Sequence, residues 1–188
     1  ATQVLYSLSP DFLASLSQFL SLVGMHRTAN DVTLKRYYGD DFPLADFIAA
    51  TQAHVGERVA PLKPGAIEVM DALDEMALPY GLATSSRRHW VDRHFAAHAL
   101  AERFAAIVTR QDCVEGKPHP EPYLNAARLL GVAPENTLAL EDSHPGVRAA
   151  HAAGCMTVMV PDLLAPDEEM RAKARVLNSL HDVLALLR

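Results

Sequence analysis

The spacing of apolar residues differs between the two parts of this 188-residue chain. Over residues 1–60 they recur every three or four positions, as on one face of a helix, and no strand pattern is evident. The first run ends at Gly24 and has its apolar positions at Phe12, Leu13, Leu16, Phe19, Leu20 and Val23. Two further helices are predicted over residues 29–38 and 43–59. This part of the chain is therefore predicted to be all helical.

After Pro64 the pattern alternates between helical stretches of about ten residues and short apolar runs. Helices are predicted over residues 66–76, 88–97, 121–130, 146–153 and 179–187. Strands are predicted over residues 80–84, 106–109, 137–140 and 157–160. Strands separated by helices are typical of βαβ units with right-handed crossovers. The predicted fold is therefore α/β, with a doubly wound parallel sheet and a Rossmann-like core.

Composition excludes some classes of function. The net charge is −6, and the basic residues are scattered rather than clustered, which argues against a nucleic-acid partner. No apolar run approaches the roughly 20 residues of a membrane helix, and no signal pattern opens the chain, so we expect no membrane partner and a cytoplasmic protein. Cys113 and Cys155 have neither metal-ligand nor disulfide spacing. His94 and His98 are spaced like metal ligands, but no third ligand follows at a useful distance, and we predict a surface helix there.

Polar residues follow three of the predicted strands or lie in the connections after them. Thr84 and Ser85 come after an apolar strand, where a hydroxyl and free N–H groups can bind a phosphate oxygen. Lys117 lies in a stiff Gly-Lys-Pro turn, and its ammonium could neutralise a phosphate. Glu141 and Asp142 end a strand and suit Mg²⁺. Taken singly, each has a plainer interpretation: a helix cap, a solvated loop lysine, or acids favoured by a helix dipole.

Together, these segments resemble the second, third and fourth motifs of the haloacid dehalogenase superfamily, with the closest likeness to its phosphatase and β-phosphoglucomutase branch. The resemblance rests on Thr84-Ser85, Gly116-Lys117-Pro118 and Glu141-Asp142-Ser143-x-x-Gly146. It extends over essentially the whole chain. It implies a small all-helical cap domain over residues 1–62 and a Rossmann-like core domain over residues 63–188.

The resemblance also implies a role for each matching residue in the core. Thr84 would bind the transferring phosphoryl group through its hydroxyl, and Ser85 would bind it through its backbone N–H. Lys117 would hold phosphate and nucleophile together. Asp142 would bind Mg²⁺ with Glu141 close by, so that both are expected as metal ligands. Thr84, Lys117 and Asp142 are thus the expected catalytic residues.

The expected cap contributes candidates for substrate binding. The turn from Gly24 through Met25 and His26 to Arg27 resembles the cap segment that brings an arginine to the substrate in sugar-phosphate members. Arg27 is the first candidate for specificity, and His26 lies beside it. An exposed arginine at a helix start is the plainer interpretation of the same residue.

One part of the family pattern is missing from these residues. The family's first strand ends in Asp-x-Asp-Gly, which supplies the nucleophile and the general acid/base, and no such motif occurs here. In the family this strand lies between the strand that ends at Thr84 and the one that ends at Leu140. We expect the native polypeptide to carry roughly 20 to 30 further N-terminal residues, the size of a strand-plus-helix start.

The predicted function is that of a Mg²⁺-dependent phosphatase. It would hydrolyse a small phosphorylated metabolite, such as a sugar phosphate or phosphoglycolate, through an aspartyl-phosphate intermediate. A β-phosphoglucomutase-like phosphomutase would use the same core residues. A haloacid dehalogenase is a further alternative and would need no metal. The alternative that is not an enzyme is a catalytically inactive module that binds a phosphate ester. The sequence does not predict the oligomeric state.

Overall fold

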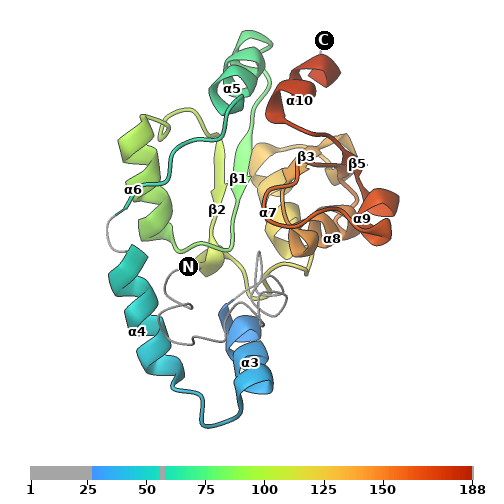
Figure 1. The fold of residues 1–188 in the computed structure, drawn as a ribbon. Helices are drawn as coiled ribbons and strands as arrows, with labels where there is room; N and C mark the ends of the chain where they lie inside the picture. Colours follow the sequence, from blue (N-terminus) through green and yellow to red (C-terminus); the bar gives the residue numbers. More distant parts are fainter. Residues whose placement is uncertain (1–26, 56–57, 188) are drawn as a thin grey trace. The chain divides into compact units, whose positions relative to one another are not determined.

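The computed structural model describes residues 27–55 and 58–187 and divides the chain into two compact units, Ala1–Val59 and Ala60–Arg188 (Figure 1). The first unit contains α3 (Arg27–Tyr38) and α4 (Leu44–Val55), where helices are predicted over 29–38 and 43–59. The predicted helix that ends at Gly24 lies outside the described residues. The domain border predicted at 62/63 lies three residues beyond the division between the units and stays a prediction.

The second unit alternates strands and helices, as its apolar pattern predicts. Its strands are β1 (Gly81–Ala83), β2 (Ala106–Val108), β3 (Leu138–Glu141), β4 (Met156–Met159) and β5 (Arg175–Val176). Its α-helices are α5 (Ala66–Glu75), α6 (Arg88–His98), α7 (Glu121–Leu130), α8 (His144–Ala152), α9 (Glu168–Lys173) and α10 (Leu180–Leu187). Two short 3₁₀ turns, η2 (Arg110–Asp112) and η3 (Pro134–Asn136), precede α7 and β3.

All strand pairs in the described residues are parallel, and they form two ladders. One ladder joins β1 to β2, with Leu82 opposite Ile107. The other runs β3-β4-β5, with Leu140 opposite Val158. The division falls between β1 and β3, where the resemblance places the strand that carries Asp-x-Asp-Gly. The α/β doubly wound fold is confirmed.

Side chains that alternate along the strands pack against helices on both faces of the sheets. On one face α5 and α6 cover Leu82 of β1, while α5 and α10 cover Leu138 and Leu140 of β3. On the other face α7 packs against Ala83 of β1, and α7 and α8 pack against Ala139 of β3. Because helices cover both faces, β1, β2 and the first three residues of β3 are apolar and lack a hydrophilic side.

Glycines determine where two of these helices begin and end. Gly65 precedes α5 with φ of +88°, and a Cβ there would lie 2.9 Å from Cβ of Leu180. Gly131 ends α7 with φ of +69°, and its N–H bonds the carbonyls of Ala127 and Arg128. Glycine reaches such left-handed backbone angles at no steric cost. Backbone geometry therefore explains why α5 begins after Gly65 and why α7 ends at Leu130, as the predicted helix over residues 121–130 does.

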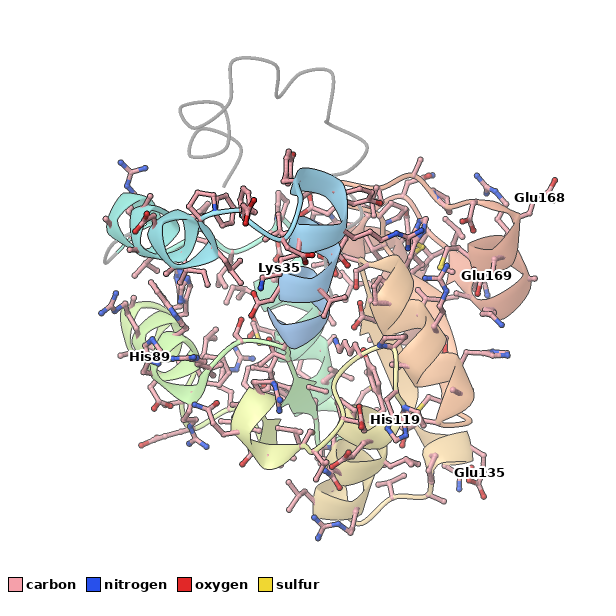
Figure 2. The ribbon with its side chains drawn as sticks, turned by 90° about the horizontal axis from the view of Figure 1, so that it is seen from below. Lys35, His89, His119, Glu135, Glu168 and Glu169 are labelled. Carbon is pink, nitrogen blue, oxygen red and sulfur yellow. The ribbon has the colours of Figure 1, made fainter. Side chains whose placement is uncertain are left out.

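No helix or strand is predicted from the sequence at α9 and β5. Residues 165–174 carry charges of both signs, and their pattern predicts a solvated face. Met170 of α9 is fully buried against Val147 of α8 and Met159 of β4. Glu169 binds Arg148 of α8 at 2.5 Å, and in Figure 2 Glu168 and Glu169 both project from α9. One buried methionine among charged residues is too weak a pattern to predict a helix. None of the described helices is long and apolar enough to cross a membrane.

Candidate active site

Glu141, the last residue of β3, has a buried carboxylate with both oxygens occupied by protein donors. Oε1 accepts hydrogen bonds from the Lys117 ammonium and the Tyr123 hydroxyl. Oε2 accepts one from Ser143 Oγ at 3.0 Å and two from the backbone N–H groups of Asp142 and Ser143 at 3.1 and 3.3 Å. A buried carboxylate is stable only when it is paired and hydrogen-bonded in this way.

The turn into α8 leaves room for this carboxylate because residue 146 is glycine. A Cβ built on Gly146 would overlap the Glu141 carboxylate. Ser143 is the N-cap of α8, and its Oγ accepts a hydrogen bond from the N–H of Gly146 at 3.2 Å. The same hydroxyl therefore caps the helix and donates to Glu141. The Ser-x-x-Gly spacing thus holds the glutamate against the first turn of α8.

Charge and burial shift the pKa of the Glu141 carboxyl in opposite directions. Burial alone would raise its pKa, but the Lys117 charge and the hydrogen bonds outweigh burial and hold the pKa below its usual range. Burial and the Glu141 charge together raise the pKa of Tyr123 well above its ordinary value. Near neutral pH, Glu141 is therefore charged, and Tyr123 keeps the proton that it donates.

Lys117 lies in the connection between β2 and α7, and it is 8% exposed. Its Nζ is bound to Glu141 and lies 5.1 Å from the centroid of the Tyr123 ring, within the range of a cation–π contact. The peptide bond that joins it to Pro118 is cis. The contacts with Glu141 and with the Tyr123 ring therefore hold the Lys117 ammonium in one place. The bond to Glu141 uses one of the three N–H donors of the ammonium.

Asp142 follows Glu141 but differs from it in surroundings. The residue is exposed, and among the described residues no other one donates a hydrogen bond to its carboxylate. Partial desolvation and the neighbouring Glu141 charge raise the pKa of this carboxyl, while Lys117 and Lys63 oppose the rise. One carboxylate of the pair is therefore committed inside the protein, and the other is available to a ligand at the carboxyl end of β3.

Thr84 and Ser85 follow β1 and are both half-buried. The N–H of Thr84 extends the ladder by bonding the carbonyl of Val108 at 2.9 Å. Its Oγ1 accepts a hydrogen bond from the N–H of Ser86 at 3.1 Å, so the chain turns immediately after the strand. The hydroxyl proton of Thr84 remains available for a ligand oxygen.

The other predicted residues have different outcomes. His26 lies outside the described residues. Arg27 is the first residue of α3, but its side chain is not described. Both stay predictions. No role is predicted from the sequence for Tyr123 or Ser143, whose hydroxyls bind Glu141. The only signals for them are a Tyr in the first turn of α7 and the Ser-x-x-Gly spacing.

Residues 9–160 match the family model of the haloacid dehalogenase-like hydrolases. The chain belongs to this family. That match covers more than half of the chain, and the resemblance predicted from the three motifs is confirmed.

Named relatives and solved structures agree with this membership. Hexitol phosphatase B of Escherichia coli (strain K12) is 35% identical over 130 residues, which are 69% of this chain and 59% of that protein. Protein CbbY of Cupriavidus necator is 35% identical over 136 residues, 69% of this chain and 54% of that protein. A crystal structure of CbbY from Rhodobacter sphaeroides with phosphate has a TM-score of 0.72 at 27% identity, covering 89% of this chain and 78% of that one. The chain thus spans little more than half the length of these curated relatives.

Proposed function

We propose that this protein is a Mg²⁺-dependent phosphatase that hydrolyses a small phosphomonoester. The observation that carries the proposal is the pair of carboxylates at the end of β3. Glu141 binds the Lys117 ammonium, whereas Asp142 is exposed and receives no hydrogen bond from another residue in the described part of the chain. Ligands of open parallel sheets bind at this edge. Family membership and phosphatase relatives support the same chemistry.

The donor chemistry of Asp142 fits magnesium. Mg²⁺ prefers hard oxygen ligands and is usually held by one or two carboxylates together with phosphate and water. Among residues 27–55 and 58–187 no group of three His, Cys, Asp or Glu side chains could hold a metal ion, so Asp142 would supply a single carboxylate. Both oxygens of Glu141 are already occupied, and this geometry favours Glu141 as the residue that positions Lys117 rather than as a metal ligand.

Each remaining residue has a role in phosphoryl transfer, where the protein mainly positions groups and neutralises charge. The Lys117 ammonium would neutralise a phosphate oxygen. The hydroxyl of Thr84 and the N–H of Ser85 would donate to other oxygens of the same phosphate. Mg²⁺, when bound at Asp142, would offset further negative charge on the phosphate. A sugar phosphate or phosphoglycolate is the proposed class of substrate.

The proposal includes a covalent step on a carboxylate. An aspartate would attack the phosphorus atom, the alcohol would leave, and water would then hydrolyse the aspartyl phosphate. These 188 residues contain no Asp-x-Asp-Gly motif to supply that nucleophile. The tests below therefore use the full-length protein.

The first test separates Asp142 from other exposed acids at this edge. Asp142→Asn should lower Mg²⁺-dependent turnover of p-nitrophenyl phosphate by about 100-fold or more, since losing even an outer-shell partner of a metal costs 10- to 100-fold. The matched control is Asp162→Asn, because Asp162 follows β4 and is half-exposed in its pair with Lys63. Full activity in Asp142→Asn would remove this residue from the site, and turnover that survives chelation would contradict the metal.

A second test separates the two carboxylates by role. If Glu141 positions Lys117, Glu141→Gln should lower kcat by about tenfold or more while leaving the Mg²⁺ concentration for half-maximal activity nearly unchanged. Asp142→Asn should shift that Mg²⁺ concentration upward. An equal upward shift in both variants would make Glu141 a metal ligand as well. Product analysis with a hexose 1-phosphate distinguishes hydrolysis from transfer by a phosphomutase.

A further inference from the structure

Two histidines near the end of α6 bind the backbone of one residue, Ala60. The N–H of Ala60 donates to His94 Nε2 at 3.1 Å, and the carbonyl of Ala60 lies 2.9 Å from His98 Nε2. His94 and His98 are four residues apart on one helix, so their side chains lie on the same face. The pair spaced like metal ligands therefore holds a peptide segment in this structure.

The partners determine which ring nitrogens carry protons. His94 Nδ1 lies 2.8 Å from the carbonyl of Trp90, which can only accept, so this nitrogen carries the proton. The other nitrogen, Nε2, is then a bare lone pair suited to the N–H of Ala60. His98 Nε2 must in turn be protonated to donate to the Ala60 carbonyl. His94, with its proton on Nδ1, and His98, with a proton on Nε2, thus match the donor and the acceptor of a single residue.

Ala60 is the first residue of the second unit, directly after Val59, the last residue of the first. It is exposed, so water could bond its backbone groups, and burial alone does not explain the two histidines. Leu62, two residues on, packs with Phe95 of α6. Figure 1 shows the chain running beside α6 before it enters α5. The junction between the units is therefore fastened to α6 by both backbone and side chain.

We propose that His94 and His98 are positioning residues that fix the direction in which the chain leaves the second unit. We call this arrangement the histidine clamp. The two histidines lie on α6, which begins at Arg88, just after the Thr84–Ser86 turn that is proposed to bind phosphate. The histidine clamp therefore connects the junction between the units to this turn through α6. The consequence for catalysis rests on the proposed function and on the expectation that the cap over residues 1–62 contributes to substrate binding. A loosened clamp then weakens substrate binding more than it slows the chemical step.

The first experiment measures the clamp itself in the full-length protein. His94→Leu removes the acceptor of the Ala60 N–H. Hydrogen exchange at that amide should become about five- to tenfold faster, which corresponds to the net free energy of one neutral hydrogen bond. His98→Leu removes the donor to the Ala60 carbonyl and should speed tryptic cleavage after Arg58. His94→Gln and His98→Gln keep an acceptor and a donor and should stay close to wild type. The control is His89→Leu on the same helix, since His89 is exposed and contacts the Trp90 ring.

The second experiment measures the effect on turnover. Both Leu variants should raise KM for a sugar phosphate several-fold while kcat changes less than twofold, and the Gln variants should restore KM.

Unchanged exchange and cleavage in both Leu variants would overturn the clamp. Faster exchange with an unchanged KM would overturn its positioning role. If the wild-type protein shows no turnover, the proposed function fails, whereas exchange and cleavage still decide whether the clamp holds the junction. The Leu variants remove opposite halves, so either one that folds gives the result.

Discussion

The turns that follow β3 and β1 both face the carboxyl edge of a parallel ladder, yet they are built differently. In the β3 turn (residues 141–146), Glu141 is buried and accepts five hydrogen bonds. In the β1 turn (residues 84–87), Thr84 is half-buried and accepts one hydrogen bond, from Ser86. The N-cap residue of α8, Ser143, caps its own helix through its side chain. The N-cap residue of α6, Arg87, does not, and the first N–H of that helix, at Arg88, instead donates to Gln111 Oε1 at 3.1 Å. The β3 turn is organised by its own side chains, whereas the β1 turn is held by backbone groups and by Gln111 and leaves the hydroxyl proton of Thr84 available.

This difference separates two ways of preparing a phosphate site. The β3 turn holds the Lys117 ammonium in place before any ligand arrives, which is the preorganisation that makes electrostatic stabilisation effective. The β1 turn offers a hydroxyl whose proton is still available. Substitutions in the β3 turn should therefore change both stability and activity, whereas those in the β1 turn should change activity alone.

The largest effect is expected from removing Lys117, the cation that binds Glu141 of the β3 turn. Lys117→Met leaves the Glu141 carboxylate buried without its charge partner, which typically costs about 3 to 5 kcal/mol. The free energy of unfolding from urea titration measures the loss. The matched control is Lys63→Met, because Lys63 and Asp162 are both about half exposed and such a pair is worth about 1 kcal/mol or less. Similar losses in the two variants would mean that Glu141 is not committed to Lys117.

The next effect is expected from filling the space beside the carboxylate. Gly146→Ala places a Cβ where Glu141 lies, and such overpacking costs about 3 kcal/mol at the upper end of its usual range. Turnover should fall with stability, because a displaced Glu141 releases Lys117. Gly154→Ala is the comparison, since a Cβ there would meet nothing within 4 Å and only its positive φ is strained. Gly146→Ala with wild-type turnover would show that the position of Glu141 is unimportant.

The smallest change in stability is expected in the β1 turn. Thr84→Val keeps the shape of the side chain and removes one local hydrogen bond, so unfolding should change by about 1 kcal/mol or less. Turnover of a phosphate ester should nevertheless fall about tenfold or more, and Thr84→Ser should recover it. A stability loss as large as that of Lys117→Met would contradict the contrast between the two turns.

Much of the second unit could be predicted because its apolar runs and turn glycines agree with each other. The predicted helix over residues 121–130 coincides with α7, which ends at Gly131. The α9 helix was missed because its apolar contribution to the core is Met170, and only packing against α8 and β4 buries it. Burial of a single side chain depends on residues distant in sequence, which a local pattern does not contain.

The sequence by itself determined the alternation of strands and helices. It also predicts that Thr84 and Glu141-Asp142 follow parallel strands at their carboxyl ends, where such sheets bind ligands. Only the tertiary structure decided between the adjacent carboxylates. Helices cover both faces of β3, so its pattern Leu-Ala-Leu-Glu has no hydrophilic side to show where Glu141 points. Glu141 is bound inside the protein by Lys117, Tyr123 and the first turn of α8, whereas Asp142 stays exposed. These contacts join residues distant in sequence, so they arise only when the chain is folded.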